Sequence, residues 1–476
     1  MARVVVFTTS ASVLIIEILA GRLLAPYLGV SLEVFTGIIG VILAGISIGA
    51  WLGGRAADRL DPTRLPGPLM VAGGLSAILS PVIIDFFGPG VGINPLSIVF
   101  LATVGFVVPA ALLSAVSPIV VKIRLASLDN TGSVVGSYSA IGTAGAIFGT
   151  FVTGFVLIAA FPTRPIVAGL GLLLSLGGAS LMIGRGRWVP LAVLLVAVGS
   201  ATALASSDGP CQYETTYHCA DVVVDPDRPT GRLLILDRGH NSYVDLEDPT
   251  YLDFRYARVM ADVIDANFAS GPLSVLSIGG GGFTFPQYLE ATRPGTDHVV
   301  LEIDRLLVDI GRSELGFEDE AEVVIADARQ SIQDVPPASI DLVIGDAFSG
   351  LTVPWHLTTA EFVSIVDSRM APTGLYLINV IDYGDLDFAM STVKTFEAVF
   401  DHVAVIAPPS YLSGEAGGNF VIVGSQAALD TPALIRAIAE RGGSEAVLTG
   451  ADLESFTTGG LVLRDDFAPV DQMIDR

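Results

Sequence analysis

Residues 273–282 read Leu-Ser-Val-Leu-Ser-Ile-Gly-Gly-Gly-Gly, and residues 298–304 read His-Val-Val-Leu-Glu-Ile-Asp. The first stretch predicts an apolar strand that opens into a glycine turn, where backbone N–H groups can approach a ligand closely. The second predicts the next strand with Glu302 at its end, where a carboxylate can hydrogen-bond a ribose diol. Together they indicate a doubly wound nucleotide-binding site.

From Ser274 onward, short apolar runs alternate with helical patterns, which predicts an α/β doubly wound domain with a parallel sheet. Ligands in such sheets bind at the carboxyl ends of the strands. The first four predicted strand ends suit a nucleotide-type cofactor and carry Gly279, Gly280, Gly281, Gly282, Glu302, Asp327 and Asp346. Strands are expected near 274–279, 298–303, 322–327, 341–346, 374–381, 402–407 and 419–424, and helices near 283–293, 305–315, 358–370, 389–399 and 432–441.

The segment before this sheet predicts a smaller unit. Two apolar runs, 222–224 and 233–236, flank a turn rich in Pro, Asp and Gly, and a helical pattern covers 253–266. We expect a small β subdomain and linker helix over residues 207–270, followed by the Rossmann-like domain over 271–476.

Four motifs at the predicted strand ends resemble the spermidine synthase family. They are Ile278-Gly-Gly-Gly-Gly282, Leu301-Glu-Ile-Asp304, Ala326-Asp-Ala328 and Ile344-Gly-Asp-Ala-Phe-Ser349. Residues 17–27, 53–59 and 465–471 also resemble segments of the membrane-fused spermidine synthase-like (polyamine aminopropyltransferase-like) proteins. The resemblance therefore covers nearly the full length of the chain.

That family transfers an aminopropyl group from decarboxylated S-adenosylmethionine on a methyltransferase-like fold. The resemblance implies that Glu302 holds the ribose hydroxyls and that Asp327, followed by Ala328, faces the adenine amino group. Asp346 matches the catalytic aspartate, which would take a proton from the attacking amine. A carboxylate suits that role because an amine is a nucleophile only after it loses its proton. Tyr256 matches the tyrosine of the family's amine-binding motif.

The chain departs from the family pattern at three places. Gly282 and Ser349 stand where the family has acidic residues, and Ala257-Arg258 follows the motif tyrosine in place of His/Gln-Glu. These changes remove much of the charge that would bind a diamine, so a methyltransferase on the same fold is a second hypothesis. A third, of another class, is a transporter or membrane scaffold whose soluble domain binds a ligand without chemistry.

The loop over residues 347–357 follows the fourth predicted strand and is expected to cover the site. His356 in this loop is either an additional acid or base, or a residue that packs or caps the helix near Thr358. Further candidates precede the sheet, stand beside His356 or lie near residue 465; Asp465 and Asp466 either reach the site or form surface ion pairs. These further candidates are His240, Ser242, Tyr243, Trp355, Asp465 and Asp466.

Residues 1–206 form a multi-pass α-helical membrane domain of about seven spans, each long enough for a bilayer core of about 30 Å. The first is not a cleaved signal peptide, because it carries Glu17 and Arg22 and leads directly into another span. The spacings Gly45-x-x-x-Gly49 and Gly145-x-x-x-Gly149 predict close helix packing. The spans lie near 4–24, 34–54, 68–87, 95–121, 133–160, 165–183 and 188–206.

Basic residues follow spans two, four and six, which by the positive-inside rule puts the N-terminus in the cytoplasm. Seven spans then put the globular domain outside, which suits Cys211 and Cys219, whereas a nucleotide-type cofactor favours the cytoplasm. A miscount by one span reverses the answer, so the side stays open. The two cysteines form a disulfide or remain inert thiols, and with His218 they are too few for a metal site.

Charged residues in spans are functional candidates by default. Glu17, Arg22 and Glu33 lie toward the side of the globular domain. They are expected either to lock helices through an ion pair of Arg22 with Glu17 or Glu33, or to form a polar site. That site would receive a lipid, a membrane-anchored substrate or a transported solute.

Charge is distributed unevenly along the chain. Residues 1–206 hold ten Lys/Arg and six Asp/Glu, whereas residues 207–476 hold 15 and 43. So acidic a domain excludes nucleic acid as a partner, because it repels phosphates. The acidity is either a solvated surface or a site for a cationic substrate such as a polyamine.

The leading hypothesis is a membrane-bound spermidine synthase-like transferase. It would use S-adenosylmethionine or its decarboxylated form to alkylate an amine or another nucleophile, with Asp346 as base and no metal. The expected partners are the lipid bilayer and a small-molecule amine or membrane-associated substrate, and a homodimer is left open.

Overall fold

The computed structural model describes all residues except 93, 126–130, 184–187, 349, 351 and 475–476. The chain divides into two compact units, a helical unit over Met1–Cys219 and an α/β unit over Ala220–Arg476. Each unit has hydrophobic cores of its own. The domain boundaries expected after residues 206 and 270 stay predictions.

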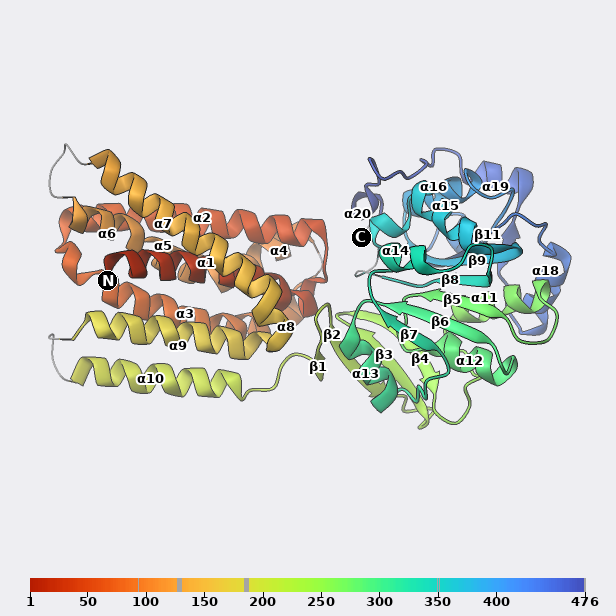
Figure 1. Cartoon of the computed structure of the whole chain (residues 1–476), viewed down its shortest axis with the longest axis horizontal. Coiled ribbons are helices and arrows are strands. Elements are labelled where there is room, and N and C mark those ends of the chain that lie inside the picture. Colours follow the sequence, from red (N-terminus) through yellow and green to blue (C-terminus); the bar gives the residue numbers. More distant parts are fainter. Residues whose placement is uncertain (93, 126–130, 184–187, 349, 351, 475–476) are drawn as a thin grey trace. The chain divides into compact units, whose positions relative to one another are not determined.

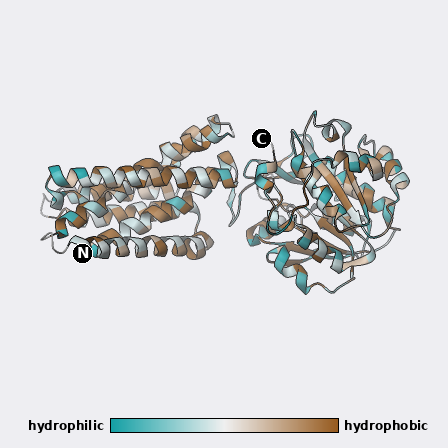
Figure 2. Cartoon of the chain, turned by 90° about the horizontal axis from the view of Figure 1, so that it is seen from above, coloured by the Kyte–Doolittle hydropathy of each residue, from teal (hydrophilic) through white to brown (hydrophobic). Residues whose placement is uncertain are grey.

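The helical unit is a bundle of long apolar helices (Figures 1 and 2). In the described ranges, six helical segments are long and apolar enough to cross a membrane, and Pro190–Ala205 is a shorter apolar helix. Six spans are thus compatible with an integral membrane region, and the seventh stays a prediction. The helices are α1 (Ala2–Leu28), α2 (Leu32–Arg59), α3 (Pro66–Phe87), α4 (Pro95–Ala102), α5 (Val108–Ser114), α6 (Val116–Arg124), α7 (Thr131–Val152), α8 (Ile158–Ala160), α9 (Thr163–Leu181) and α10 (Trp188–Ala205).

Glycines allow close packing of two helix pairs in this unit. Gly49 of α2 faces the backbone of Ala111 on α5, and Gly145 and Gly149 of α7 face the backbone of Phe7 and Ala11 on α1. A side chain at any of these three glycines would collide with a carbonyl oxygen. The small-residue spacing therefore predicts the close packing of these pairs correctly.

The α/β unit is built on an eight-stranded sheet of order β12-β10-β11-β9-β8-β5-β6-β7. The five strands from β9 to β7 are parallel, and β11, β10 and β12 pair antiparallel. The strands are β5 (Ser274–Ile278), β6 (Asp297–Glu302), β7 (Glu322–Ile325), β8 (Ile340–Gly345), β9 (Met370–Asp382), β10 (His402–Ala407), β11 (Gly418–Ser425) and β12 (Ala446–Leu448).

The expectation of a wholly parallel sheet is wrong at one edge. Between β10 and β11 the structure has only the four-residue helix α17 (Pro409–Leu412). A parallel connection needs a crossover of about a dozen residues or more, usually a longer helix, so β11 pairs antiparallel. The seven predicted strands agree with β5 to β11, whereas β12 was not predicted.

Helices cover both faces of the large sheet, because alternate strand residues point to opposite sides. Val275 of β5 joins one core with α11, α12 and α18, whereas Leu276 joins the other with α15 and α16. The helices are α11 (Arg255–Asn267), α12 (Thr284–Thr292), α13 (Arg305–Glu314), α14 (Ala328–Ser331), α15 (Ala360–Arg369), α16 (Asp387–Glu397), α18 (Thr431–Glu440), α19 (Gly450–Phe456) and α20 (Val470–Met473).

A smaller four-stranded sheet of order β1-β2-β3-β4 precedes the large one. Its strands are β1 (Tyr213–Glu214), β2 (Cys219–Val224), β3 (Gly231–Leu236) and β4 (Gly239–Asp245). The sequence predicts the apolar strands β2 and β3, but not β1 and β4, which are rich in polar residues.

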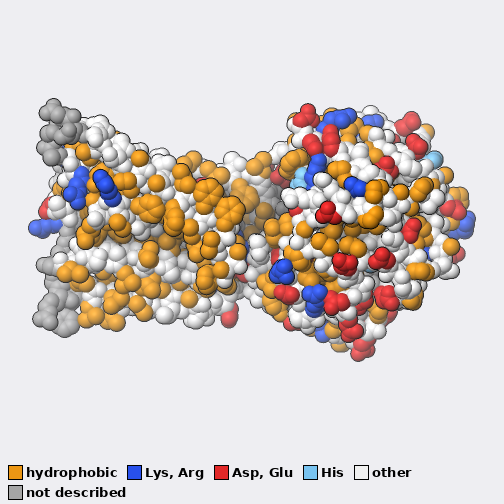
Figure 3. Space-filling view, viewed as in Figure 1, with side chains coloured by type: hydrophobic (Ala, Val, Ile, Leu, Met, Phe, Trp, Pro, Cys, Tyr) orange, Lys and Arg blue, Asp and Glu red, His pale blue; other side chains and the backbone are white. Residues whose placement is uncertain are grey.

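The surfaces of the two units differ in composition. Hydrophobic side chains are spread over the visible face of the helical unit with few charged side chains among them, and acidic side chains are spread over the α/β unit (Figure 3). The first pattern suits a lipid environment and the second suits water.

Candidate active site

The glycine turn lies where β5 ends, between β6 and β8. Gly279 and Gly281 have φ values of 94° and 51°, which favour glycine. A side chain on Gly279 would lie 2.7 Å from the carbonyl oxygen of Asp346. The turn therefore approaches the β8 loop closely, and its contact with a ligand stays a prediction.

Glu302 is the last residue of β6 and is only 6% exposed. Its Oε2 accepts a hydrogen bond from the N–H of Gly280, and its Oε1 accepts one from the N–H of Asp304, both at 2.8 Å. These bonds fix the carboxylate beside the glycine turn. Its position suits the predicted contact with a ribose diol.

Asp346 follows β8 and is held by two donors. Tyr256 Oη of α11 donates to Oδ2 at 2.9 Å, and Asn379 Nδ2 of β9 donates to Oδ1 at 2.9 Å. Burial raises the pKa of Asp346 to about 6, although both hydrogen bonds lower it. A carboxylate with a pKa near neutrality is suited to act as a general base.

The structure adds two residues that the sequence analysis did not single out. Asn379 is buried among the apolar residues at the centre of strand β9, and its Oδ1 accepts from Asn419 Nδ2 of β11 at 2.9 Å. The chain Asn419–Asn379–Asp346 orients the carboxylate from the side opposite Tyr256. A buried asparagine within a run of apolar residues was the available signal.

Asp327 and His356 lie together at the end of β7. Asp327 caps α14 by accepting from the N–H of Gln330, and its Oδ2 lies 3.2 Å from His356 Nε2. Ala328 is the buried first residue of α14. The cap of α15 is Thr359, whose Oγ1 accepts from the N–H of Phe362, so His356 does not cap this helix.

Asp465 is anchored near this corner. It pairs with Arg329 Nη2 at 2.5 Å and accepts from Thr359 Oγ1 at 2.7 Å. Arg329 also donates to the carbonyl oxygen of His356 at 2.6 Å. The C-terminal segment thus supports the loop that carries His356. Ser349, one of the departures from the family pattern, lies outside the described residues.

Strand β4 packs on the end of the glycine turn. Ser242 Oγ accepts from the N–H of Gly282 at 2.9 Å and donates to Asn241 Oδ1 at 3.0 Å. A Cβ on Gly282 would lie 2.7 Å from Ser242 Cβ. Ser242 therefore occupies the space that an acidic side chain at position 282 would need.

This contact gives a stability prediction for Gly282→Asp. The added side chain should overpack against Ser242 and lower the free energy of unfolding of the α/β unit by about 1–3 kcal/mol. In a Ser242→Gly background the space is vacant, so the same substitution should cost clearly less. Thermal midpoints of the four combinations measure this coupling, and purely additive effects would contradict the packing argument.

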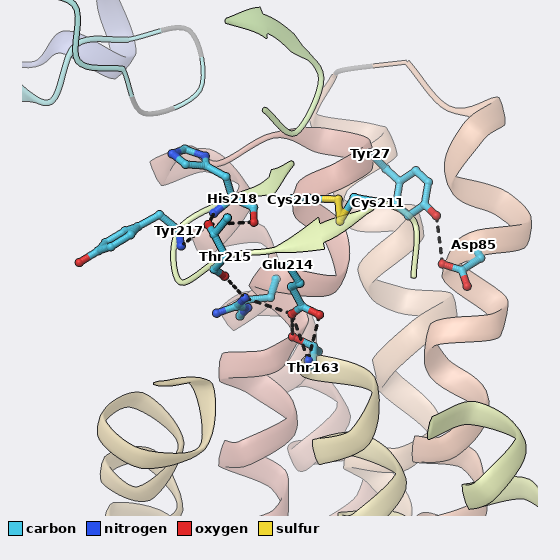
Figure 4. The surroundings of a disulfide bond; sticks show 10 residues. Tyr27, Asp85, Thr163, Cys211, Glu214, Thr215, Tyr217, His218 and Cys219 are labelled. Carbon is cyan, nitrogen blue, oxygen red and sulfur yellow. Dashed lines mark hydrogen bonds and ion pairs between the residues drawn. A yellow bond between two sulfur atoms is a disulfide. The ribbon is translucent and has the colours of Figure 1, made fainter. Parts of the chain in front are cut away.

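Arg22 does not form the ion pair expected for it. In the described part of the helical unit it pairs with Glu214 at 3.1 Å, not with Glu17 or Glu33. Glu214 also accepts from the N–H of Thr163 at 3.0 Å, at the start of α9 (Figure 4). The missed partner follows the last apolar run, and folding alone brings it to the end of α1.

Glu17 and Glu33 do not take part in the Arg22–Glu214 ion pair. Glu17 is partly buried on α1, and Glu33 is exposed in the first turn of α2. The predicted polar site of Glu17, Arg22 and Glu33 stays a prediction.

Cys211 and Cys219 form a disulfide beside Glu214 (Figure 4), which decides between the two options left open for them. Groups of three metal-ligating side chains are not found in the described residues.

Comparisons with known proteins show which proteins this chain is similar to. No family model matches the chain. A probable spermidine synthase from Corynebacterium glutamicum is 29% identical, with a TM-score of 0.50, over 54% of this chain and 97% of its own. The polyamine aminopropyltransferase of Chromobacterium violaceum is 28% identical over 141 residues, 29% of this chain. The spermidine synthase of Thermotoga maritima is 22% identical, covers 46% of this chain and 71% of its own, and has a TM-score of 0.34.

The match spans about half, 53%, of the curated aminopropyltransferase. The sheet order and the glycine turn, together with the likeness to the Corynebacterium glutamicum protein, define a spermidine synthase-like α/β fold. Within that fold class, the chain resembles the spermidine synthase, or polyamine aminopropyltransferase, family in both sequence and fold. It carries long apolar helices ahead of the family's α/β fold.

Proposed function

We propose that this protein is a membrane-bound transferase that alkylates an amine or another nucleophile with an S-adenosylmethionine-type cofactor. The observation that carries the proposal is Asp346, held between Tyr256 and Asn379 with a raised pKa, directly beside the glycine turn. The residues present fit such a cofactor. The turn Gly279–Gly282 brings its backbone close to Asp346, and Glu302 offers a fixed carboxylate beside the turn.

In the bound cofactor, a sulfonium group would supply the electrophilic carbon. Gly279–Gly282 would hold the cofactor, Glu302 would accept hydrogen bonds from the ribose hydroxyls, and Asp327 with Ala328 would face the base. Asp346 would accept the proton that the attacking nucleophile loses. Tyr256 and Asn379 would keep the carboxylate oriented toward that proton. His356, beside Asp327, would serve as an additional acid or base.

Calorimetric titration of the detergent-solubilised protein tests the proposal. The ligands are S-adenosylmethionine, its decarboxylated form and methylthioadenosine. Binding of the decarboxylated form alone supports aminopropyl transfer, and preference for the full cofactor supports methyl transfer. If none binds, the proposal fails, and a ligand-binding or transport role becomes the stronger hypothesis.

Methyl transfer is the second candidate function. It is favoured by the contact of Ser242 with Gly282, because the family's acidic residue at this position has no room. Without that carboxylate the site offers less charge to a cationic cofactor tail. Product mass separates the two reactions, since a methyl and an aminopropyl group differ.

The pH dependence of the reaction follows from the pKa of Asp346. The base acts only when it is ionised, so kcat/KM should fall about tenfold per pH unit below about pH 6 and level off above it. The pH profile between 5 and 9 measures this. A profile that stays flat down to pH 5 would mean that Asp346 is not the base.

We further propose that the α/β unit lies outside the cytoplasm, which requires its cofactor to be supplied in that compartment. Glu214 follows α10 and pairs with Arg22 near the end of α1, which supports an odd number of crossings. Asp58, Lys122 and neighbouring basic residues lie at the other ends of their helices. Basic ends favour the cytoplasm, and a disulfide persists in an oxidising compartment.

Cysteine labelling in intact cells tests this placement. An impermeant maleimide should label Cys211 and Cys219 only after an impermeant reductant has been added. Labelling that requires permeabilised cells, and no reductant, would put the α/β unit in the cytoplasm. The Cys211→Ser, Cys219→Ser variant is the background control, because these are the chain's two cysteines.

A further inference from the structure

A pocket on the α/β unit lies apart from the candidate active site. It is formed where the first turns of α11 meet the segment after α18, and it is lined by Arg255, Arg258, Asp262, Arg441, Ser444 and Glu445 among others. Tyr256, which reaches Asp346, belongs to the same helix but does not line the pocket. The pocket and the catalytic group therefore use different faces of α11.

Three arginines in one pocket are notable in a segment with 15 basic and 43 acidic residues. Arg441 is neutralised, because its Nε pairs with Asp262 at 2.6 Å and its Nη2 with Asp265 at 3.3 Å. Arg255 has a longer contact, with its Nε 3.5 Å from Glu445 Oε1, and its side chain is 55% exposed.

Arg258 carries the least compensated charge of the three. Its described contact is a 2.9 Å hydrogen bond from Nη2 to the neutral carbonyl oxygen of Asp253. In the described part of the unit it forms no ion pair. Arg258 is exposed and lines the pocket. The pocket thus holds one guanidinium without a carboxylate partner and a second that is only partly paired.

We propose that this pocket binds a phosphate group, with Arg258 and Arg255 as its ligands. Guanidinium groups present N–H donors in a planar fork that matches the oxygens of phosphate, and they stay charged at all physiological pH values. The N–H groups of Arg441, Gly442 and Gly443 are already bonded to carbonyl oxygens of α18, so the arginine side chains carry the recognition. Free phosphate and a phosphate monoester share this chemistry.

Calorimetric titration of the full-length protein with inorganic phosphate tests the site, at constant ionic strength adjusted with NaCl. A second titration uses glycerol 3-phosphate. Arg258→Gln, alone and with Arg255→Gln, should weaken phosphate binding about tenfold or more. Arg436→Gln is the matched control, because Arg436 is exposed on α18, does not line the pocket and carries the same charge.

The proposal is supported if phosphate binds the wild-type protein and the Arg436 variant but binds the Arg258 variants more weakly. Tighter binding of glycerol 3-phosphate then identifies an ester as the ligand, and tighter binding of inorganic phosphate identifies the free ion. Equal phosphate affinity in the wild-type and Arg258 variants overturns the proposal. The absence of any binding by the wild-type protein overturns it too. Circular dichroism of each variant verifies that it is folded.

Discussion

Asp346→Asn should lower the rate of the transfer reaction by roughly 10²–10⁴-fold, the range that a general base contributes. The asparagine has the same shape but does not accept a proton from the nucleophile. Cofactor binding should change little, because the predicted cofactor contacts are made by Gly279–Gly282 and Glu302. Turnover and calorimetric affinity, measured on the same preparation, test both parts. Full activity in this variant would remove Asp346 from the mechanism.

The thermal stability of the Asp346→Asn variant is the control that its loss of activity does not come from unfolding. Burial raises the pKa of this carboxyl to about 6, so between about pH 4 and 6 the folded protein binds more protons than the unfolded chain. Asp346 therefore destabilises the fold as the pH rises through this window, by up to about 3 kcal/mol. Asparagine removes that cost but mismatches one of the two donors, at about 1–3 kcal/mol. The thermal midpoint at pH 8 should thus shift by only a few degrees.

Glu302→Ala should have the second largest effect, a loss of cofactor affinity of about 30-fold or more. The substitution removes a charged acceptor for the ribose diol, and hydrogen bonds to charged groups contribute about 1.5–3 kcal/mol each. It also leaves the N–H groups of Gly280 and Asp304 without their acceptor, which loosens the turn. Titration with methylthioadenosine isolates this contact, because that ligand has the ribose but no amino acid tail.

Two comparisons make the Glu302 experiment specific. Asp309→Ala is the matched control, since Asp309 is an exposed carboxylate on the neighbouring helix α13. A 2′-deoxy form of methylthioadenosine should bind the wild-type protein more weakly, whereas the Glu302 variant should not distinguish the two ligands. If that variant still prefers the 2′-hydroxyl form, another residue holds the ribose.

The sequence was sufficient for the elements whose signal is local. Strand β5 and the glycine turn could be predicted because apolar runs and glycine-rich turns are recognised within a few residues of sequence. The five helices predicted in the large α/β domain, over 283–293 to 432–441, agree with α12, α13, α15, α16 and α18 to within a few residues. Strands β1 and β4 were missed because short polar strands carry no apolar pattern.

Only part of the candidate site could be predicted from the sequence, because only part of it depends on local signals. Glu302, Asp327 and Asp346 lie at or just after strand ends. The rule that ligands bind at the carboxyl ends of the strands predicts that these three residues lie at the same edge of the sheet. Asn379 and Asn419 lie on strands that are distant in sequence, and only the pairing of β9 with β11 brings their amides together. His356 was placed in the right loop, but its contact with Asp327 depends on how that loop folds back.

By itself, the sequence determined the apolar helices, most strands of the large sheet, the glycine turn and the resemblance to spermidine synthases, because each depends on patterns within short segments. Tertiary structure alone decided that Arg22 pairs with Glu214, that Ser242 fills the space beside Gly282, and that Cys211 and Cys219 are joined. It also gathered Arg255, Arg258 and Arg441 into one pocket. Most of these contacts join residues far apart along the chain, and hydrogen bonds and ion pairs depend on distances of a few ångströms that only packing fixes.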